Sequence, residues 1–171
     1  MKKWKKDIII NVPIEFAWPY FYGDLEKKKA IFPKIIDEEV LKETHEVEGT
    51  IIRQAYKNGS IDESYDLTIK KFINEPNHKL VQEAFILNNM FRMKVDYELN
   101  SVDENQTRFT YRSVNRPRNP LLSLFQLFGK DDVIIRFMNR TKTNIEEAYN
   151  SNGVEQDVIV TPGEIEVVPE K

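Results

Sequence analysis

Residues 35 to 115 leave this chain few possible folds, because apolar and polar residues largely alternate along them. Alternation with period two is typical of strands with one buried face. Turn-forming residues divide this stretch, and no segment with helical spacing lies between the divisions. Parallel strands need such a crossover helix, so the sequence predicts an antiparallel meander. Its six predicted strands span 35–48, 50–57, 60–73, 79–87, 90–100 and 107–115.

Turn length fixes the register of neighbouring strands, and the register decides which side chains share a face. Asn58-Gly59 and Asn88-Asn89 are interpreted as two-residue turns, and residues 102–106 as a five-residue loop. The predicted cross-strand pairs are therefore Tyr56 with Ile61, Ala84 with Met93, Tyr97 with Tyr111, and Leu99 with Phe109.

These registers place one mostly apolar set of side chains on a shared inward face. One strand fits poorly, because Val81, Phe85 and Leu87 then point outward. That misfit indicates a bulge or a register slip, or an apolar contact surface. The predicted inward residues are Ile52, Gln54, Tyr56, Glu63, Tyr65, Leu67, Ala84, Ile86, Met93, Val95, Tyr97, Leu99, Phe109, Tyr111 and Ser113.

The segments before the meander predict one strand and two short helices. Residues 3–12 alternate and predict the strand. Ile14–Tyr22 carries aromatic residues at helical spacing, although Pro19 removes a backbone donor and shortens that helix. Asp24 is a suitable N-cap for a second short helix over residues 25–31.

A long amphipathic helix is predicted to begin at Asp131 or Asp132 and to run for about five turns. After it the chain is acidic and poor in core residues. We therefore expect one domain over residues 1–150 and an acidic, mobile C-terminal tail over 151–171. The apolar positions of the helix are Val133, Ile134, Phe137, Met138, Thr141, Ile145 and Ala148.

Composition excludes several kinds of chemistry. The chain has no cysteine, which removes disulfides, thiolate nucleophiles and thiolate zinc sites. Its two histidines, His45 and His78, lie in unrelated segments and form no metal-binding pair. We therefore expect no metal and no organic cofactor, and we assign no catalytic residue.

Charge and hydropathy narrow the partners. The first 150 residues are nearly neutral, and the lysines at 27–29 are interpreted as a solvated face, so we expect no nucleic-acid partner. The apolar run at residues 8–10 is much shorter than the core of a signal peptide. No apolar stretch approaches the roughly 20 residues of a membrane span. These observations favour the cytoplasm, without stable membrane insertion.

The order of these elements resembles the START-like or SRPBCC superfamily, also called the helix-grip fold. The segment Asn11-Val-Pro-Ile-Glu-Phe-Ala-Trp18 is similar to the strand-to-helix junction of that superfamily, and the resemblance covers residues 3–150. Lipid-transfer START domains, pollen-allergen-like proteins and the polyketide cyclase/dehydrase/lipid-transport group are members. The resemblance implies an α+β fold in which a curved seven-stranded antiparallel sheet grips the long C-terminal helix, with a cavity between them.

A curved sheet cannot touch a straight helix along its whole length, so bulky side chains or a ligand must fill the gap. We expect the protein to bind, as carrier or sensor, a hydrophobic or amphipathic small molecule such as a lipid, sterol or polyketide. Tyrosine hydroxyls and Glu63 would orient it. The predicted ligand-binding residues are Ile52, Tyr56, Glu63, Tyr65, Leu67, Met93, Val95, Tyr97, Phe109, Tyr111, Ser113, Phe125, Ile134, Phe137 and Met138.

Two other functions fit the same sequence. A cyclase or hydratase would use Glu63 or a tyrosine as acid or base in the same cavity. A protein-interaction module would use the outward Val81, Phe85 and Leu87 together with the apolar run 121–128. That run has three interpretations: core packing, a lid over the cavity, or a contact with a second copy of the chain or a membrane surface.

Overall fold

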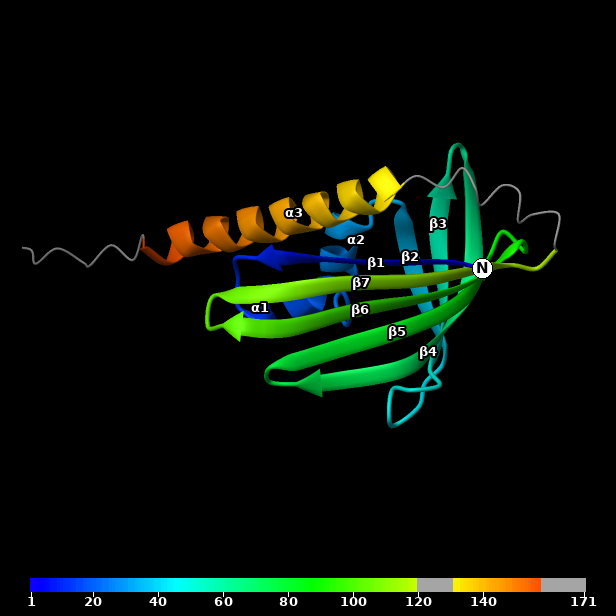
Figure 1. Cartoon of the computed structure of the whole chain (residues 1–171), viewed down its shortest axis with the longest axis horizontal. Coiled ribbons are helices and arrows are strands. Elements are labelled where there is room, and N and C mark those ends of the chain that lie inside the picture. Colours follow the sequence, from blue (N-terminus) through cyan, green and yellow to red (C-terminus); the bar gives the residue numbers. More distant parts are fainter. Residues whose placement is uncertain (120–130, 158–171) are drawn as a thin grey trace, which may run out of the picture.

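The computed structural model describes residues 1–119 and 131–157. They form one sheet with helices on one side of it (Figure 1). The strands are β1 (Lys2–Ile10), β2 (Ile35–Lys42), β3 (Ile51–Asn58), β4 (Ile61–Glu75), β5 (His78–Leu87), β6 (Phe91–Asp103) and β7 (Gln106–Pro117). The helices are α1 (Ile14–Ala17), the 3₁₀ turn η1 (Trp18–Tyr20), α2 (Leu25–Ile31) and α3 (Asp131–Asp157).

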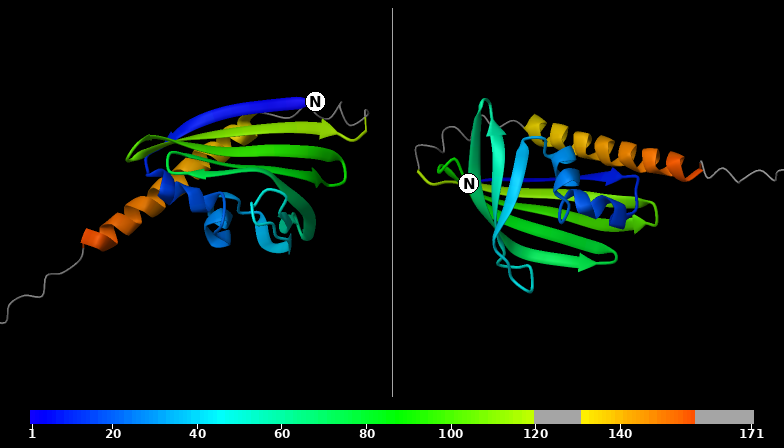
Figure 2. Two further views of the ribbon diagram at one scale, coloured as in Figure 1. Left: turned by 90° about the horizontal axis from the view of Figure 1, so that it is seen from below. Right: turned by 180° about the vertical axis from the view of Figure 1, so that it is seen from behind.

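All neighbouring strands are antiparallel, in the order β1-β7-β6-β5-β4-β3-β2. The sheet curves, and α3 runs across it on the same side as α1 and α2 (Figure 2). The expected α+β arrangement of a seven-stranded antiparallel sheet and a long C-terminal helix is therefore confirmed. Within the described residues, no helix combines the length and apolar character needed to cross a membrane.

Local sequence explains where the helices begin and end. The Asp24 carboxylate accepts a hydrogen bond from the Lys27 amide at 3.0 Å, which caps α2. The segment 14–22 divides into α1 and η1, because Pro19 lacks the donor that a continuous α-helix needs there. At the other end of the chain, α3 continues to Asp157, seven residues past the expected domain boundary at 150.

Two of the three predicted registers keep the expected faces. The pairs Leu99 with Phe109 and Tyr97 with Tyr111 are confirmed. In the β3–β4 hairpin, Tyr56 faces Glu63 rather than Ile61. Gly59 and Ser60 form that turn, with Gly59 at a φ of 66°. The shift is two residues, so the same side chains still face inward.

The third register, between β5 and β6, was predicted wrongly. The loop has three residues, 88–90, and Phe85 faces Met93. A one-residue shift reverses the faces of a strand. Ile86, expected inside, is 42% exposed, whereas Val81 is fully buried and Phe85 packs against the core. Of the alternatives that the misfit of Val81, Phe85 and Leu87 left open, the register slip is confirmed and the outward apolar contact surface is wrong.

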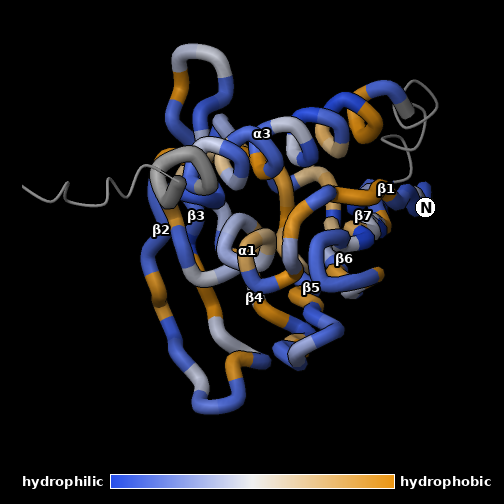
Figure 3. Tube along the Cα trace, turned by 90° about the vertical axis from the view of Figure 1, so that its left-hand side faces the viewer, coloured by the Kyte–Doolittle hydropathy of each residue, from blue (hydrophilic) through white to orange (hydrophobic). Residues whose placement is uncertain are grey.

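Hydrophobic and hydrophilic segments are interspersed along the strands (Figure 3). Burial alternates along part of β4, where Leu67 and Ile69 are buried and Asp66 and Lys70 are exposed, as one-sided burial requires. Aromatic rings pack together where α1 and η1 fit between the sheet and the C-terminal half of α3. There the rings of Phe21 and Phe109 lie 4.7 Å apart, and those of Phe16 and Tyr149 lie 4.9 Å apart. Ile145 of α3 is fully buried beside them.

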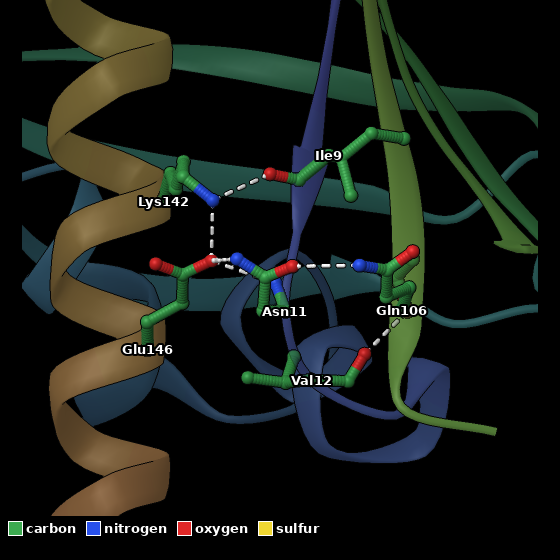
Figure 4. Close-up of polar contacts among 7 residues, drawn as sticks. Ile9, Asn11, Val12, Gln106, Lys142 and Glu146 are labelled. Atoms are coloured by element: carbon green, nitrogen blue, oxygen red, sulfur yellow. Dashed lines mark hydrogen bonds and ion pairs between the residues drawn. The ribbon is translucent and has the colours of Figure 1, made fainter. Parts of the chain in front are cut away.

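A group of polar contacts holds α3 to the end of β1 (Figure 4). Glu146 accepts hydrogen bonds from the backbone amide of Asn11 at 2.6 Å and from its side-chain amide at 2.9 Å. The Lys142 ammonium donates to the Ile9 carbonyl at 2.8 Å and pairs with Glu146. Burial by itself would raise the pKa of Glu146, but Lys142 and Asn11 outweigh it and hold that pKa below its ordinary value.

Replacing Glu146 by alanine is expected to lower the free energy of unfolding by about 1–3 kcal/mol. The substitution removes a carboxylate that accepts two hydrogen bonds from Asn11 and pairs with Lys142. The folded pKa is depressed, so this contribution is present at neutral pH and disappears as the pH falls through the folded pKa. Urea unfolding at pH 7 and at pH 3 measures it. Glu147→Ala on the exposed neighbour is the control, and an equal loss in both variants would contradict the account.

Candidate functional site

A cavity of about 640 Å³ lies between the sheet and the N-terminal half of α3. Strands β3 to β6 provide one wall, and the end of α2 with the following residues provides another. Val133, Arg136 and Phe137 of α3 close the third side. The cavity therefore lies on the N-terminal side of the Glu146 contacts along α3.

Five of the fifteen predicted ligand-binding residues line this cavity: Tyr56, Tyr65, Met93, Tyr97 and Phe137. Of the other ten, eight lie in the core or at its edge. Phe125 and the run 121–128 lie outside the described residues. Buried elsewhere in the core are Ile52, Leu67, Val95, Phe109, Ser113 and Met138, while Tyr111 and Ile134 are half-buried and Glu63 lines a separate hollow described below.

Aromatic rings separate the cavity from the packed core. Phe32 stacks on Phe137 with centroids 5.1 Å apart, and it meets Tyr97 edge-on at 5.5 Å. Across the cavity, Tyr65 stacks on Phe85 at 4.6 Å. Such rings offer a large apolar surface with defined orientation, which suits a planar or aliphatic guest.

A buried charged cluster lies against the same cavity. The Lys28 ammonium is 2.8 Å from Glu38 and 3.7 Å from Glu83. Gln54 donates to Glu38 at 2.6 Å and accepts a hydrogen bond from the Tyr65 hydroxyl. Lys28, Gln54 and Glu83 are each more than 90% buried. Charges are rarely buried this deeply unless they are paired.

Burial and charge shift the pKa values of this cluster in a consistent way. Burial raises the pKa of Glu83 above its ordinary value, and Lys28 reduces this effect without cancelling it. Burial alone would lower the pKa of Lys28, but Glu83 and Glu38 together raise it. Burial and the nearby charge of Glu83 raise the pKa of Tyr97. Lys28 therefore stays charged, while Glu83 takes up a proton more readily than an ordinary glutamate.

Sequence reasoning missed both Lys28 and Glu83. Lys28 belongs to the run 27–29 that was interpreted as solvated. Glu83 was placed outside by the one-residue register error in β5. The misfit of Val81 and Phe85 was the available signal, because moving them inward brings Glu83 in with them.

Glu63 occupies a different environment. Strands β4 and β5 pair from Thr68 opposite Ala84 to Glu75 opposite His78. On the other side of Thr68, towards Glu63, the two strands diverge and leave a hollow of about 940 Å³ in the sheet. Glu63 accepts hydrogen bonds from Tyr56 and Asn58, which lower its pKa. Burial and Glu63 raise the pKa of Tyr56 to about 12. A carboxylate held in its charged form is a poor general acid.

The remaining charges are at the rim and are mostly positive. Lys34, Arg136 and Arg140 line the cavity and are exposed. Arg140 also donates to the Ile31 carbonyl at 3.2 Å, which joins α3 to α2 beside the cavity. Among the described residues, no group of three histidine or carboxylate side chains could hold a metal ion.

Comparison with solved structures identifies the fold. No protein-family model and no curated protein matches this sequence. The ginseng major latex-like protein 151 from Panax ginseng superposes with a TM-score of 0.62 at 12% identity, over 86% of this chain and 96% of that chain. The chain has the START-like, helix-grip fold.

Two enzymes share this fold. The Zhui aromatase/cyclase from Streptomyces sp. R1128 superposes with a TM-score of 0.55 at 12% identity, over 92% of this chain and 96% of that chain. Norcoclaurine synthase from Thalictrum flavum, solved in complex with dopamine and hydroxybenzaldehyde, gives 0.58 at 11% identity, over 85% and 87%. The fold thus occurs in these two enzymes and also in the ginseng protein, whose name states no enzyme activity. The fold alone therefore does not select a function.

Replacing Lys28 by methionine is expected to destabilise the protein by about 3–5 kcal/mol, because it leaves two carboxylates near each other without their cation. Adding Glu83→Gln should restore part of that loss by removing one buried charge. Lys29→Met is the control, since Lys29 pairs with the exposed Glu26 and should change stability by at most about 0.5 kcal/mol. Chemical denaturation of the wild type, Lys28→Met, Glu83→Gln and the double variant measures the coupling, and additive effects would show that the cluster is not a unit.

Proposed function

We propose that this protein binds one hydrophobic or amphipathic small molecule, such as a lipid, sterol or polyketide, in the cavity between the sheet and α3. The observation that carries the proposal is the cavity itself. Its volume of about 640 Å³ lies within the range of ligand sites, and its walls combine aromatic rings with a few buried polar groups. Apolar burial supplies affinity, at about 25 cal/mol per Å² before ordering costs.

A cyclase-type enzyme in the same cavity is the second candidate, and Glu83 favours it. A buried carboxyl with a raised pKa accepts and returns a proton more readily than an ordinary glutamate. In this candidate the acid or base is Glu83, whereas the sequence had suggested Glu63 or a tyrosine. Conversion of a bound polyketide, followed by mass spectrometry, separates the candidates. An enzyme loses turnover in Glu83→Gln while it still binds, whereas a carrier returns its ligand unchanged.

A panel of fatty acids, sterols and aromatic polyketides tests binding by thermal unfolding. At a concentration about 100 times the dissociation constant, a ligand of the folded state should raise Tm by about 5 °C or more. No shift with any of these classes would contradict the proposed function.

Filling the cavity gives the matching negative test. Met93 lines it and is half-buried, so Met93→Trp should weaken binding by roughly tenfold through lost volume. Met90→Trp is the control, because Met90 lies in the β5–β6 loop and is 38% exposed. Equal affinities in the two variants would place the ligand outside this cavity.

A further inference from the structure

Two buried polar groups of the cavity have hydrogen-bonding capacity that the protein does not use. Glu83 is 6% exposed and Tyr97 is 9% exposed, and both line the cavity. Over residues 1–119 and 131–157, the Tyr97 hydroxyl makes no hydrogen bond, and the Glu83 carboxylate has one polar partner. That partner is the Lys28 ammonium at 3.7 Å, which leaves most of the acceptor sites of Glu83 unused. Buried polar groups are nearly always partnered, so this pair points to a ligand.

The neighbouring polar groups are already engaged. Both ends of the Gln54 amide are bonded, to Glu38 and to Tyr65. Lys28 donates to Glu38 at 2.8 Å. The unmet hydrogen-bonding capacity of this part of the cavity is therefore concentrated on Glu83 and Tyr97.

These two side chains lie close enough to meet one group of a ligand. Glu83 faces Val95 across β5 and β6, and Tyr97 faces Val81, so the two are diagonal neighbours on one face of the sheet. The influence of the Glu83 charge on the pKa of Tyr97 agrees with this proximity.

The chemistry of the pair selects the kind of group. A carboxylate accepts hydrogen bonds and a phenol can donate one, so a group that both donates and accepts makes use of both side chains. A hydroxyl does both. An ammonium group has no acceptor and would meet the charge of Lys28, and a carboxylate would meet those of Glu83 and Glu38.

We infer that Glu83 and Tyr97 anchor a hydroxyl group of the ligand, so that the preferred guest is an apolar or aromatic molecule bearing a hydroxyl. The hydroxyl donates to Glu83 and accepts from Tyr97. The body of the guest lies along Phe32, Phe85 and Phe137. This inference rests on the proposed binding function and names its ligand class.

Matched ligand pairs test the anchor, with calorimetric titration as the measurement. The pairs are 2-naphthol with 2-methoxynaphthalene, and cholesterol with its 3-methyl ether. In the wild-type protein the hydroxyl member should bind at least about tenfold more tightly in the pair that fits. Glu83→Gln and Tyr97→Phe should each reduce that preference while leaving the affinity for the methyl ether nearly unchanged.

Two variants control for general effects. Glu39→Gln changes an exposed carboxylate on β2, and Tyr149→Phe removes a hydroxyl from the far end of α3; both should keep the preference. Equal binding of hydroxyl and ether, or a preference that persists in Tyr97→Phe, would overturn the anchor and leave the carrier function standing. Binding of neither member of any pair would overturn both. Circular dichroism verifies folding, and Tyr97→Phe decides the question if Glu83→Gln does not fold.

Discussion

The mismatch between a straight helix and a curved sheet determines where this protein is solid and where it is hollow. The C-terminal half of α3 is fixed to β1 by Glu146 and Lys142 and packs on a dense aromatic core. Because the sheet curves away, the N-terminal half of α3 lies over the cavity instead. The attachment of α3 to β1 and the cavity beneath the N-terminal half of α3 therefore follow from the same geometry.

The buried cluster around Lys28 is the second consequence of that hollow. Charges at this depth are stable only when they are paired, and Lys28 bridges α2 to β2 and β5 by contacting Glu38 and Glu83. The cluster gives an apolar cavity one polar region, which can orient a guest that the aromatic walls only hold. Stability and selectivity thus depend on the same side chains.

The sequence predicted the fold well because alternation and turn residues report local geometry. Helix α2 was predicted correctly from its N-cap. The β6–β7 register was also correct, although the predicted five-residue loop is a two-residue turn beside a bulge between Ser101 and Asp103. The β5 face was wrong because Asn88 and Asn89 both adopt positive φ within a three-residue loop. The extra loop residue shifts the β5 register by one, which is why the prediction placed Glu83 on the outer face. Lys28 was missed because nothing local distinguishes a lysine buried by tertiary contacts from its solvated neighbours.

The most direct test of a hollow, ligand-holding interior is native mass spectrometry of the purified full-length protein, alone and after incubation with the lipid, sterol and polyketide panel. The account predicts a discrete mass excess equal to one small molecule per chain, which is lost in denaturing spectra. A bare protein mass under every one of these conditions would contradict it.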